Sequence, residues 1–328
     1  MFFVLNCDIL NFGIAVKMFS FFLDDNICLS DSHIHLSEVS NFTDDFYETL
    51  LKQNPNLKIK LCSCAHFPYE YQKQSQIVQN LNLLNDFSDL TNDLSDNSAE
   101  KFSGSSQKLP GNSENSLLPK SSAKIKIFSA YGLHPQNKNL LSEENLKFFE
   151  DLLKKNKLDA IGECGFDLFS NEFKENFCEQ KKAFELCIEF SKKYNLPLII
   201  HNRKGIQEIF KYLGELKKIK AIVFHSFSYG SNEANYILKN GVNAFFSYGK
   251  TLLLNSKKYE NSFKTLPSDR ILLETDAPFM HSKNQEFTSP IEILDVYKKA
   301  CTLLEKNPQD LCKIVSENFD KVFDFKFP

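Results

Sequence analysis

Short apolar runs alternate along most of this chain with longer segments in which apolar residues recur at helical spacing. Eight of the runs are predicted to be strands, at 27–33, 57–63, 126–132, 160–163, 197–201, 220–225, 242–247 and 270–276. Turn signals bound them, and their nearly continuous apolar character is typical of parallel strands that are buried on both faces.

The segments between the runs predict helices. Ser142 is a good N-cap for one of them, and Asn307 followed by Pro308 indicates the start of the last. Eight strands that alternate with helices over this length predict a (β/α)₈ TIM-type barrel. The competing architecture, a doubly wound open sheet, would normally carry a Gly-rich phosphate-binding turn after its first strand, where this chain reads DSHIHL.

The chain divides into an N-terminal extension, residues 1–26, and one expected barrel domain, residues 27–328. The extension is apolar, but charged residues interrupt it and its apolar run is too short for a membrane helix. Met18 is an alternative start of the protein. Within the domain, 85–124 is rich in Ser, Asn and Asp, and it cannot bury enough apolar surface to offset its ordering entropy. We therefore expect a disordered insertion there.

Composition narrows the class of protein. The 42% hydrophobic and 25% charged residues are ordinary for a globular chain. A net charge of −3 excludes the strongly basic balance of a protein that coats nucleic acid. It leaves room for an enzyme that holds a few phosphates through metals and local cations. Nine cysteines without a secretory context indicate reduced thiols in a cytoplasmic protein. We expect no membrane anchor and no obligatory protein partner.

Histidines and carboxylates gather where the predicted strands end. His33 and His35 are two residues apart, so in an extended chain both imidazoles leave the same face. The other four residues that end strands in this way are Glu163, His201, His225 and Asp276. A single strand-end histidine is more often structural than functional. Carboxylates at the ends of apolar strands are harder to explain structurally, because an unpaired buried charge is costly.

The carboxyl ends of barrel strands form the active-site face of this fold. The six residues are therefore predicted to form one divalent-metal site, with ligands His33, His35, Glu163, His201, His225 and Asp276. Imidazole and carboxylate donors without thiolate suit Zn²⁺, Mn²⁺ or similar ions, and Mg²⁺ less well because it prefers oxygen.

The motifs DSHIHL, YGLHPQ, IGECGFD, PLIIHNR, IVFHSFSYG and ETDAP, in this order, resemble the TatD family of metal-dependent deoxyribonucleases. The likeness runs over about 27–323, apart from the insertion. It implies two divalent ions, drawn from Mg, Mn, Zn or Co. His33, His35 and Asp276 would hold one ion and His201 and His225 the other, with Glu163 as the bridge.

The resemblance also implies roles for the residues around the ions. Such ions activate water at neutral pH and polarise a phosphoryl oxygen. Asp276 and Glu163 would be the catalytic residues. Asp276 would orient the water and accept its proton. Asp31 is expected to support the ligands from outside. His134 and Arg203 resemble substrate-binding positions, where a guanidinium could hold a phosphate; alternatively, they are a loop histidine and a surface arginine.

Two enzymatic functions follow from this site. The first is a deoxyribonuclease that cleaves phosphodiester bonds in the manner of a 3′–5′ exonuclease, with DNA, or else RNA, as substrate. The alternative is an amidohydrolase-type esterase, lactonase or amidase that acts on a small molecule, because one fold hosts many chemistries. A nuclease should present a cationic and aromatic groove around the metals. A small-molecule hydrolase should present a closed apolar pocket.

Overall fold

A computed structural model describes residues 27–41, 57–93, 124–282 and 284–323 of the chain. The N-terminal extension, residues 1–26, and most of the expected insertion, residues 94–123, lie outside the described part. Everything below concerns the described residues, which include all of the predicted strands.

Eight parallel strands form one sheet in the order of the sequence, from β1 to β8. Their bounds are β1 Cys28–Ile34, β2 Lys58–Ala65, β3 Lys124–Tyr131, β4 Ala160–Asp167, β5 Leu198–Arg203, β6 Ile222–Phe224, β7 Ala244–Tyr248 and β8 Ile271–Leu273. The sheet curls until its first and last strands meet. The backbone N–H of Asp276 donates to the His33 carbonyl at 3.0 Å, and that of His35 donates to the Ala277 carbonyl at 2.9 Å. The predicted TIM-type barrel is confirmed.

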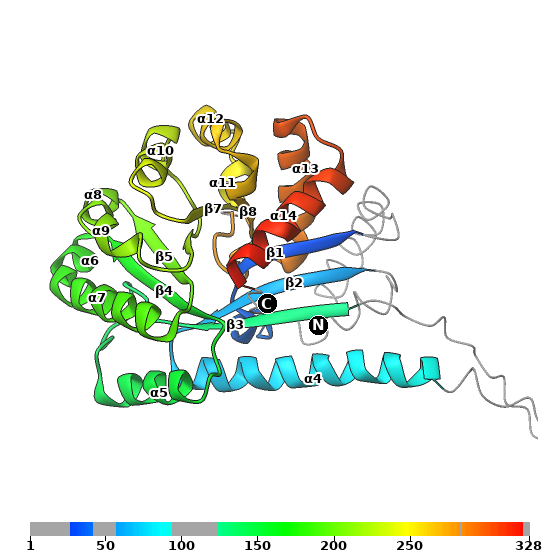
Figure 1. The fold of residues 1–328 in the computed structure, drawn as a ribbon, viewed down its shortest axis with the longest axis horizontal. Coiled ribbons are helices and arrows are strands. Elements are labelled where there is room, and N and C mark those ends of the chain that lie inside the picture. The colour runs from blue at the N-terminus through cyan, green and yellow to red at the C-terminus, as the bar shows by residue number, and fades with distance from the viewer. Residues whose placement is uncertain (1–26, 42–56, 94–123, 283, 324–328) are drawn as a thin grey trace, which may run out of the picture.

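Helices follow the strands and cover the outside of the barrel (Figure 1). Their bounds are α2 Leu36–Val39, α4 Pro68–Asp93, α5 Glu143–Lys154, α6 Asn171–Glu175, α7 Phe177–Tyr194, α8 Ile206–Phe210, α9 Leu213–Leu216, α10 Ser231–Lys239, α11 Lys250–Leu253, α12 Lys257–Thr265, η1 Ser268–Arg270, η2 Pro290–Glu292, α13 Ile293–Leu304 and α14 Pro308–Phe323. Both predicted caps are present: Ser142 accepts the Asn145 N–H of α5, and Asn307 accepts the Asp310 N–H of α14 at 2.8 Å. Among these helices, none combines the length and apolarity needed to cross a bilayer.

Helix α4 corrects one sequence-based expectation. The irregular insertion was expected to begin at Asn85, but α4 continues to Asp93 and runs alongside β2 and β3 (Figure 1). The polar composition of residues 85–93 did not indicate a helix. The segment is polar overall, yet its Leu83, Phe87 and Leu90 recur at helical spacing. The start of the expected insertion at Asn85 was therefore placed too early.

The apolar core has two layers, as barrels of this type require. The outer layer packs strand residues against the surrounding helices. The inner layer fills the barrel and includes Cys62, Phe128 and Ile199 from the strands, together with Phe319 and Phe323 from α14. Asn318 of α14 donates to the carbonyls of Ser268 and Ile271, which places this end of the helix at the amino end of β8. The apolar filling therefore leaves the carboxyl end of the barrel to other side chains.

Candidate metal centre

The structure brings together all six ligands that the sequence predicts, at the carboxyl end of the barrel. His33 lies near the end of β1, Glu163 lies within β4, and His201 lies within β5. His35 and His225 directly follow β1 and β6, and Asp276 follows β8. Convergence arises because every strand of a parallel barrel points its carboxyl end to the same side.

Glu163 lies at the centre of the cluster and is 2% exposed. Its two carboxylate oxygens face different histidines. Oε1 lies 3.1 Å from His33 Nε2 and 3.4 Å from His35 Nε2. Oε2 lies 2.8 Å from His225 Nε2 and 3.5 Å from His201 Nδ1. This two-sided arrangement is what a carboxylate shared by two ions requires.

The backbone beside Glu163 can only be glycine. Gly162 has a φ of +140°, a region that residues with a Cβ rarely adopt. A Cβ added there would lie 2.6 Å from the Ile199 carbonyl oxygen and side chain of the neighbouring strand. The close approach of β4 to β5 therefore depends on Gly162, and this approach carries the Glu163 carboxylate to His201.

Asp276 completes the Oε1 side of the cluster. Its Oδ1 lies 3.6 Å from Nε2 of both His33 and His35. Its φ of +60° is in the left-handed region, which costs energy for a non-glycine residue and is tolerated best by Asp and Asn. Strain of this kind concentrates at functional sites, because surrounding contacts must hold it in place.

Electrostatics keep both carboxylates in the form that binds metal. Burial raises the pKa of Glu163, but attraction to His33 and His225 outweighs it, and the pKa lies well below its usual value. Burial likewise raises the pKa of Asp276, but the interactions with His35, His225 and His33 together outweigh it and lower the pKa. An ionised carboxylate is the ligand form.

The donor set fits a divalent cation. His33 Nε2 and His35 Nε2 lie only 3.2 Å apart and both face Glu163, so their lone pairs converge on one small volume. Three trios have ligand atoms within 4.8 Å of one another: His33–His35–Glu163, His33–His225–Asp276 and His134–Glu163–His201. Nitrogen and carboxylate donors of this kind suit Zn²⁺, Mn²⁺ and Co²⁺.

A second layer of carboxylates orients the histidines on the Oε2 side. His201 Nε2 lies 3.2 Å from Asp167 Oδ2, and His225 Nδ1 lies 3.4 Å from Glu274 Oε1. In both histidines the other ring nitrogen is directed at Glu163. The contact of His201 with Asp167 is a hydrogen bond of the kind that usually holds metal-binding histidines, whereas Glu274 lies near His225 Nδ1 without a hydrogen bond among the described residues. Sequence reasoning did not assign roles to these carboxylates, although both lie within the quoted motifs IGECGFD and ETDAP.

Asp31 supports the site differently from the expectation. Among the interactions of the described residues, its carboxylate contacts no imidazole ring; it accepts the backbone N–H groups of His33 at 3.2 Å and Thr275 at 3.0 Å. It also accepts the Thr275 hydroxyl at 2.6 Å. Burial raises its pKa to about 7. Asp31 therefore fastens β1 to the segment that carries Asp276.

The two expected substrate residues occupy different places. His134 lies inside the cluster, with Nε2 3.3 Å from His201 Nδ1 and 3.8 Å from Glu163 Oε2. Arg203 is exposed at the end of β5, and its guanidinium stacks on the ring of Phe169 at 3.6 Å from the centroid. Arg203 is thus on the rim of the site, where it contacts none of the six ligands among the interactions described.

Sequence reasoning missed His66. The second strand was predicted to end at Ser63, but β2 continues to Ala65 and His66 directly follows it. His66 Nε2 lies 3.2 Å from Glu163 Oε1. The rule that found the other histidines, a position at the end of a strand, would have included His66 if the strand had been given its full length.

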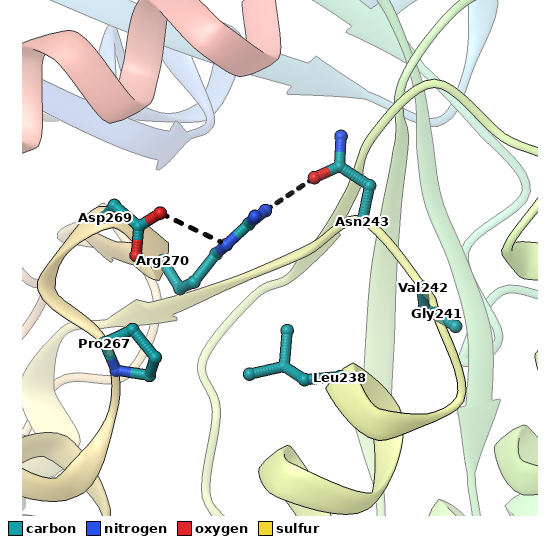
Figure 2. A pocket seen from close by; sticks show the side chains of 7 residues that line it. All are labelled: Leu238, Gly241, Val242, Asn243, Pro267, Asp269 and Arg270. Atoms are coloured by element: carbon teal, nitrogen blue, oxygen red, sulfur yellow. Dashed lines mark hydrogen bonds and ion pairs between the residues drawn. The ribbon is translucent and has the colours of Figure 1, made fainter.

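A surface hollow elsewhere on the barrel has no connection with the cluster. It lies at the amino ends of β7 and β8 and is lined by Leu238, Gly241, Val242, Asn243, Pro267, Asp269 and Arg270 (Figure 2). Arg270 donates to Asn243 Oδ1 at 2.5 Å, and its Nε lies 3.6 Å from Asp269 Oδ2. The two charged residues of the hollow, Asp269 and Arg270, are therefore already paired with each other.

Comparison with known proteins gives a consistent picture. A family model described as "TatD related DNase" matches residues 30–324. The metal-dependent hydrolase YabD of Bacillus subtilis is 30% identical over 202 residues, which cover 60% of this chain and 77% of that protein. A metal-dependent hydrolase of Haemophilus influenzae is 29% identical over 205 residues, with 58% of this chain and 75% of that protein covered.

Solved structures resemble the barrel over nearly its whole length. The TatD homologue YjjV of Escherichia coli superimposes with a TM-score of 0.67 at 20% identity, covering 92% of this chain and 98% of that one. A TatD family hydrolase of Entamoeba histolytica gives 0.64 at 18% identity, with coverage of 90% and 97%. At this level of identity the likeness concerns the fold.

Proposed function

Since this chain belongs to the family of TatD related DNases, we propose that it is a divalent-metal-dependent hydrolase that cleaves phosphodiester bonds in DNA. The observation that carries the hydrolase proposal is the two-sided Glu163 carboxylate. Each of its oxygens faces a separate pair of imidazoles. His33, His35 and Asp276 would hold one ion on the Oε1 side, and His201 and His225 would hold the other.

The rim of the site supports a nucleic acid substrate. Phe169, Phe279 and Tyr69 are 50%, 48% and 62% exposed, and each follows the carboxyl end of a strand. The Phe279 ring lies 4.9 Å from the His35 ring, beside the cluster. Exposed aromatic rings next to cations are the features by which proteins stack bases and hold the backbone of single strands.

Cations accompany one of these rings. The guanidinium of Arg203 and the ammonium of Lys204 lie 3.6 Å and 5.3 Å from the Phe169 ring centroid. Within the described part of the chain, Arg203 pairs with no carboxylate, so its charge remains open to an anionic ligand. A guanidinium suits a phosphate oxygen pair and has little use in the cleavage of a neutral lactone or amide.

Each residue of the site would have a distinct role in the hydrolysis. When bound, the ions supply Lewis acidity toward a phosphoryl oxygen and make water a better nucleophile. The Glu163 carboxylate holds the two sides together. The Asp276 carboxylate would orient the attacking water and accept its proton. Arg203 would position the phosphate from the rim, and His134 would face the substrate from within the cluster.

Metal removal tests this proposal. Protein stripped by a chelator should lose hydrolysis of a labelled single-stranded DNA, and Mn²⁺, Co²⁺, Zn²⁺ or Mg²⁺ should restore it. A parallel panel of esters, lactones and amides addresses the alternative substrates. Full DNA cleavage by demonstrably metal-free protein would end the metal-dependent mechanism. Hydrolysis of a panel member, with no DNA or RNA cleavage under any of the four ions, would replace the nuclease by a small-molecule hydrolase.

A further inference from the structure

His66 is directed into the metal centre from β2. Its Nε2 lies 3.2 Å from Glu163 Oε1, the same oxygen that His33 approaches at 3.1 Å and His35 at 3.4 Å. The His66 ring also lies 5.3 Å from the His35 ring and 4.8 Å from the His134 ring. The side chain of His66 is only 10% exposed. Its Nε2 is buried from solvent and makes no hydrogen bond to any residue that the structure describes. A buried ring nitrogen without a hydrogen-bond partner costs free energy unless a ligand such as a metal ion binds to it.

The other nitrogen of His66 faces a carboxylate. Glu70 Oε2 lies 3.8 Å from His66 Nδ1 and accepts the backbone N–H of His66 at 2.7 Å and of Phe67 at 3.3 Å. The hydroxyl of Tyr69 donates to the second oxygen of Glu70 at 3.1 Å. Glu70 therefore fixes the turn after β2 and places a negative charge behind the His66 ring.

The same geometry holds two of the expected metal ligands. His201 and His225 each direct one nitrogen at Glu163 and the other at a carboxylate, Asp167 or Glu274. His66 likewise directs Nε2 at Glu163, on the opposite oxygen, but Glu70 lies farther from its ring, at 3.8 Å from Nδ1. Glu70 therefore orients His66 through the backbone N–H groups that it accepts, and adds a negative charge behind the ring.

We propose that His66 is a ligand of the divalent ion on the Oε1 side of Glu163 and that Glu70 is its positioning residue. This inference rests on the metal centre of the proposed function, and it holds for any substrate of that centre. The Oε1 ion would then be offered the imidazoles of His33, His35 and His66 together with two carboxylates. Such a nitrogen-rich set favours Zn²⁺ or Co²⁺ over Mg²⁺ on that side.

Binding of Co²⁺ to metal-free protein, without any substrate, tests the proposal. Ions bound per chain, dissociation constants and the visible Co²⁺ spectrum are measured for the parent, His66→Ala, His66→Gln, Glu70→Gln and His281→Ala. His281 is the matched control, because it is exposed and, among the described residues, its side chain is seen to contact only the neighbouring Ser282 carbonyl. The two substitutions at His66 guard against misfolding of one, and circular dichroism of each metal-free variant reports its fold.

Both His66 variants should bind one ion at least about tenfold more weakly and show an altered spectrum, while His281→Ala matches the parent. Glu70→Gln should weaken the same ion by about tenfold, the low end of the usual effect of losing an outer partner, because Glu70 lies 3.8 Å from the ring. Parent-like affinity and spectrum in a folded His66 variant would overturn the assignment. A parent that binds no Co²⁺ would overturn it together with the metal centre. Absence of DNA cleavage with normal Co²⁺ binding would count against the nuclease alone.

Discussion

The two ends of the barrel are built from the same eight strands, yet they bury opposite kinds of side chain. Toward the amino end, Phe128 packs against Phe319 and Phe323 of α14, with ring centroids 5.3 and 6.0 Å away. At the carboxyl end the interior holds the buried Glu163 among imidazoles. Apolar burial stabilises the fold, whereas a buried charge costs free energy unless partners or a metal compensate it. Stability and chemistry are therefore separated along the barrel axis.

The two arginines of the chain show the same contrast. Arg270, at the amino end, is paired with Asp269 and Asn243 (Figure 2). Its guanidinium also lies over the Phe245 ring. Arg203, at the carboxyl end, stacks on an exposed ring and has no carboxylate partner among the described residues. A paired charge holds structure together, while an unpaired one on the rim of the histidine and carboxylate cluster is available to a ligand. Substitutions at each end should therefore have separable effects.

Glu163→Gln should have the largest effect on activity. Gln keeps the shape of the side chain but removes the charge that both histidine pairs face, so the variant should fold while losing the two-ion site. We expect a loss of DNA hydrolysis larger than the roughly 10- to 100-fold typical for loss of an outer partner. Metal content and turnover, measured beside circular dichroism, check this. Parent-like stoichiometry and rate in the variant would show that Glu163 is no bridge.

Phe319→Ala should have the largest effect on stability. The side chain is fully buried and packs against Phe128 and Phe323, so its truncation leaves a cavity that the barrel cannot fill. The free energy of unfolding should fall by about 3–5 kcal/mol, as measured by denaturant titration. The molecules that remain folded should bind metal as the parent does. Loss of metal affinity in step with stability would mean that the two ends are not separable.

Arg203→Ala should reduce DNA turnover and leave the metal content unchanged. Losing a charged hydrogen bond to phosphate corresponds to about 1.5–3 kcal/mol, or roughly a tenfold to 150-fold lower kcat/KM. Metal content should be unchanged, because Arg203 contacts no ligand of the cluster. Turnover equal to that of the parent would make Arg203 structural and would remove one support of the nuclease proposal.

Arg270→Ala is the matched control and should have the smallest effect. It removes the only other arginine, from the opposite end of the barrel. Partly exposed ion pairs contribute about 0–1 kcal/mol, so the free energy of unfolding should fall by no more than that. DNA turnover per folded molecule should match the parent. If both arginine variants lose turnover equally, the effect is global and does not come from phosphate binding at the rim.

The sequence was sufficient to predict the barrel and the convergence of the six candidate ligands, because both depend on local features. Apolar runs mark strands, and a polar residue that ends such a run must lie at one edge of a parallel sheet. The same reasoning could not assign Asp167 and Glu274 to particular histidines. Those pairings depend on how neighbouring strands are placed side by side in three dimensions. Asp167 of β4 lies opposite Arg203 of β5 in the sheet, and this register brings the Asp167 carboxylate to His201, which also lies in β5.

The remaining differences arose at element boundaries. His66 was missed because a strand was ended two residues early, before Cys64 and Ala65. The end of α4 was missed because its last turns are polar in composition, although their leucines and Phe87 have helical spacing. The position of Arg203 on Phe169 could not be predicted, because the ring comes from the loop after a different strand.

The central claim is that the buried cluster around Glu163 holds metal on both of its carboxylate oxygens. Anomalous scattering from crystals grown with Zn²⁺ or Co²⁺, recorded on both sides of the absorption edge of the metal, tests it most directly. We predict one anomalous peak between Glu163 Oε1 and the imidazoles of His33 and His35, and a second between Oε2 and the imidazoles of His201 and His225. An ordered cluster with no anomalous peak at either oxygen, in protein that cleaves DNA under the same metal, would contradict the account.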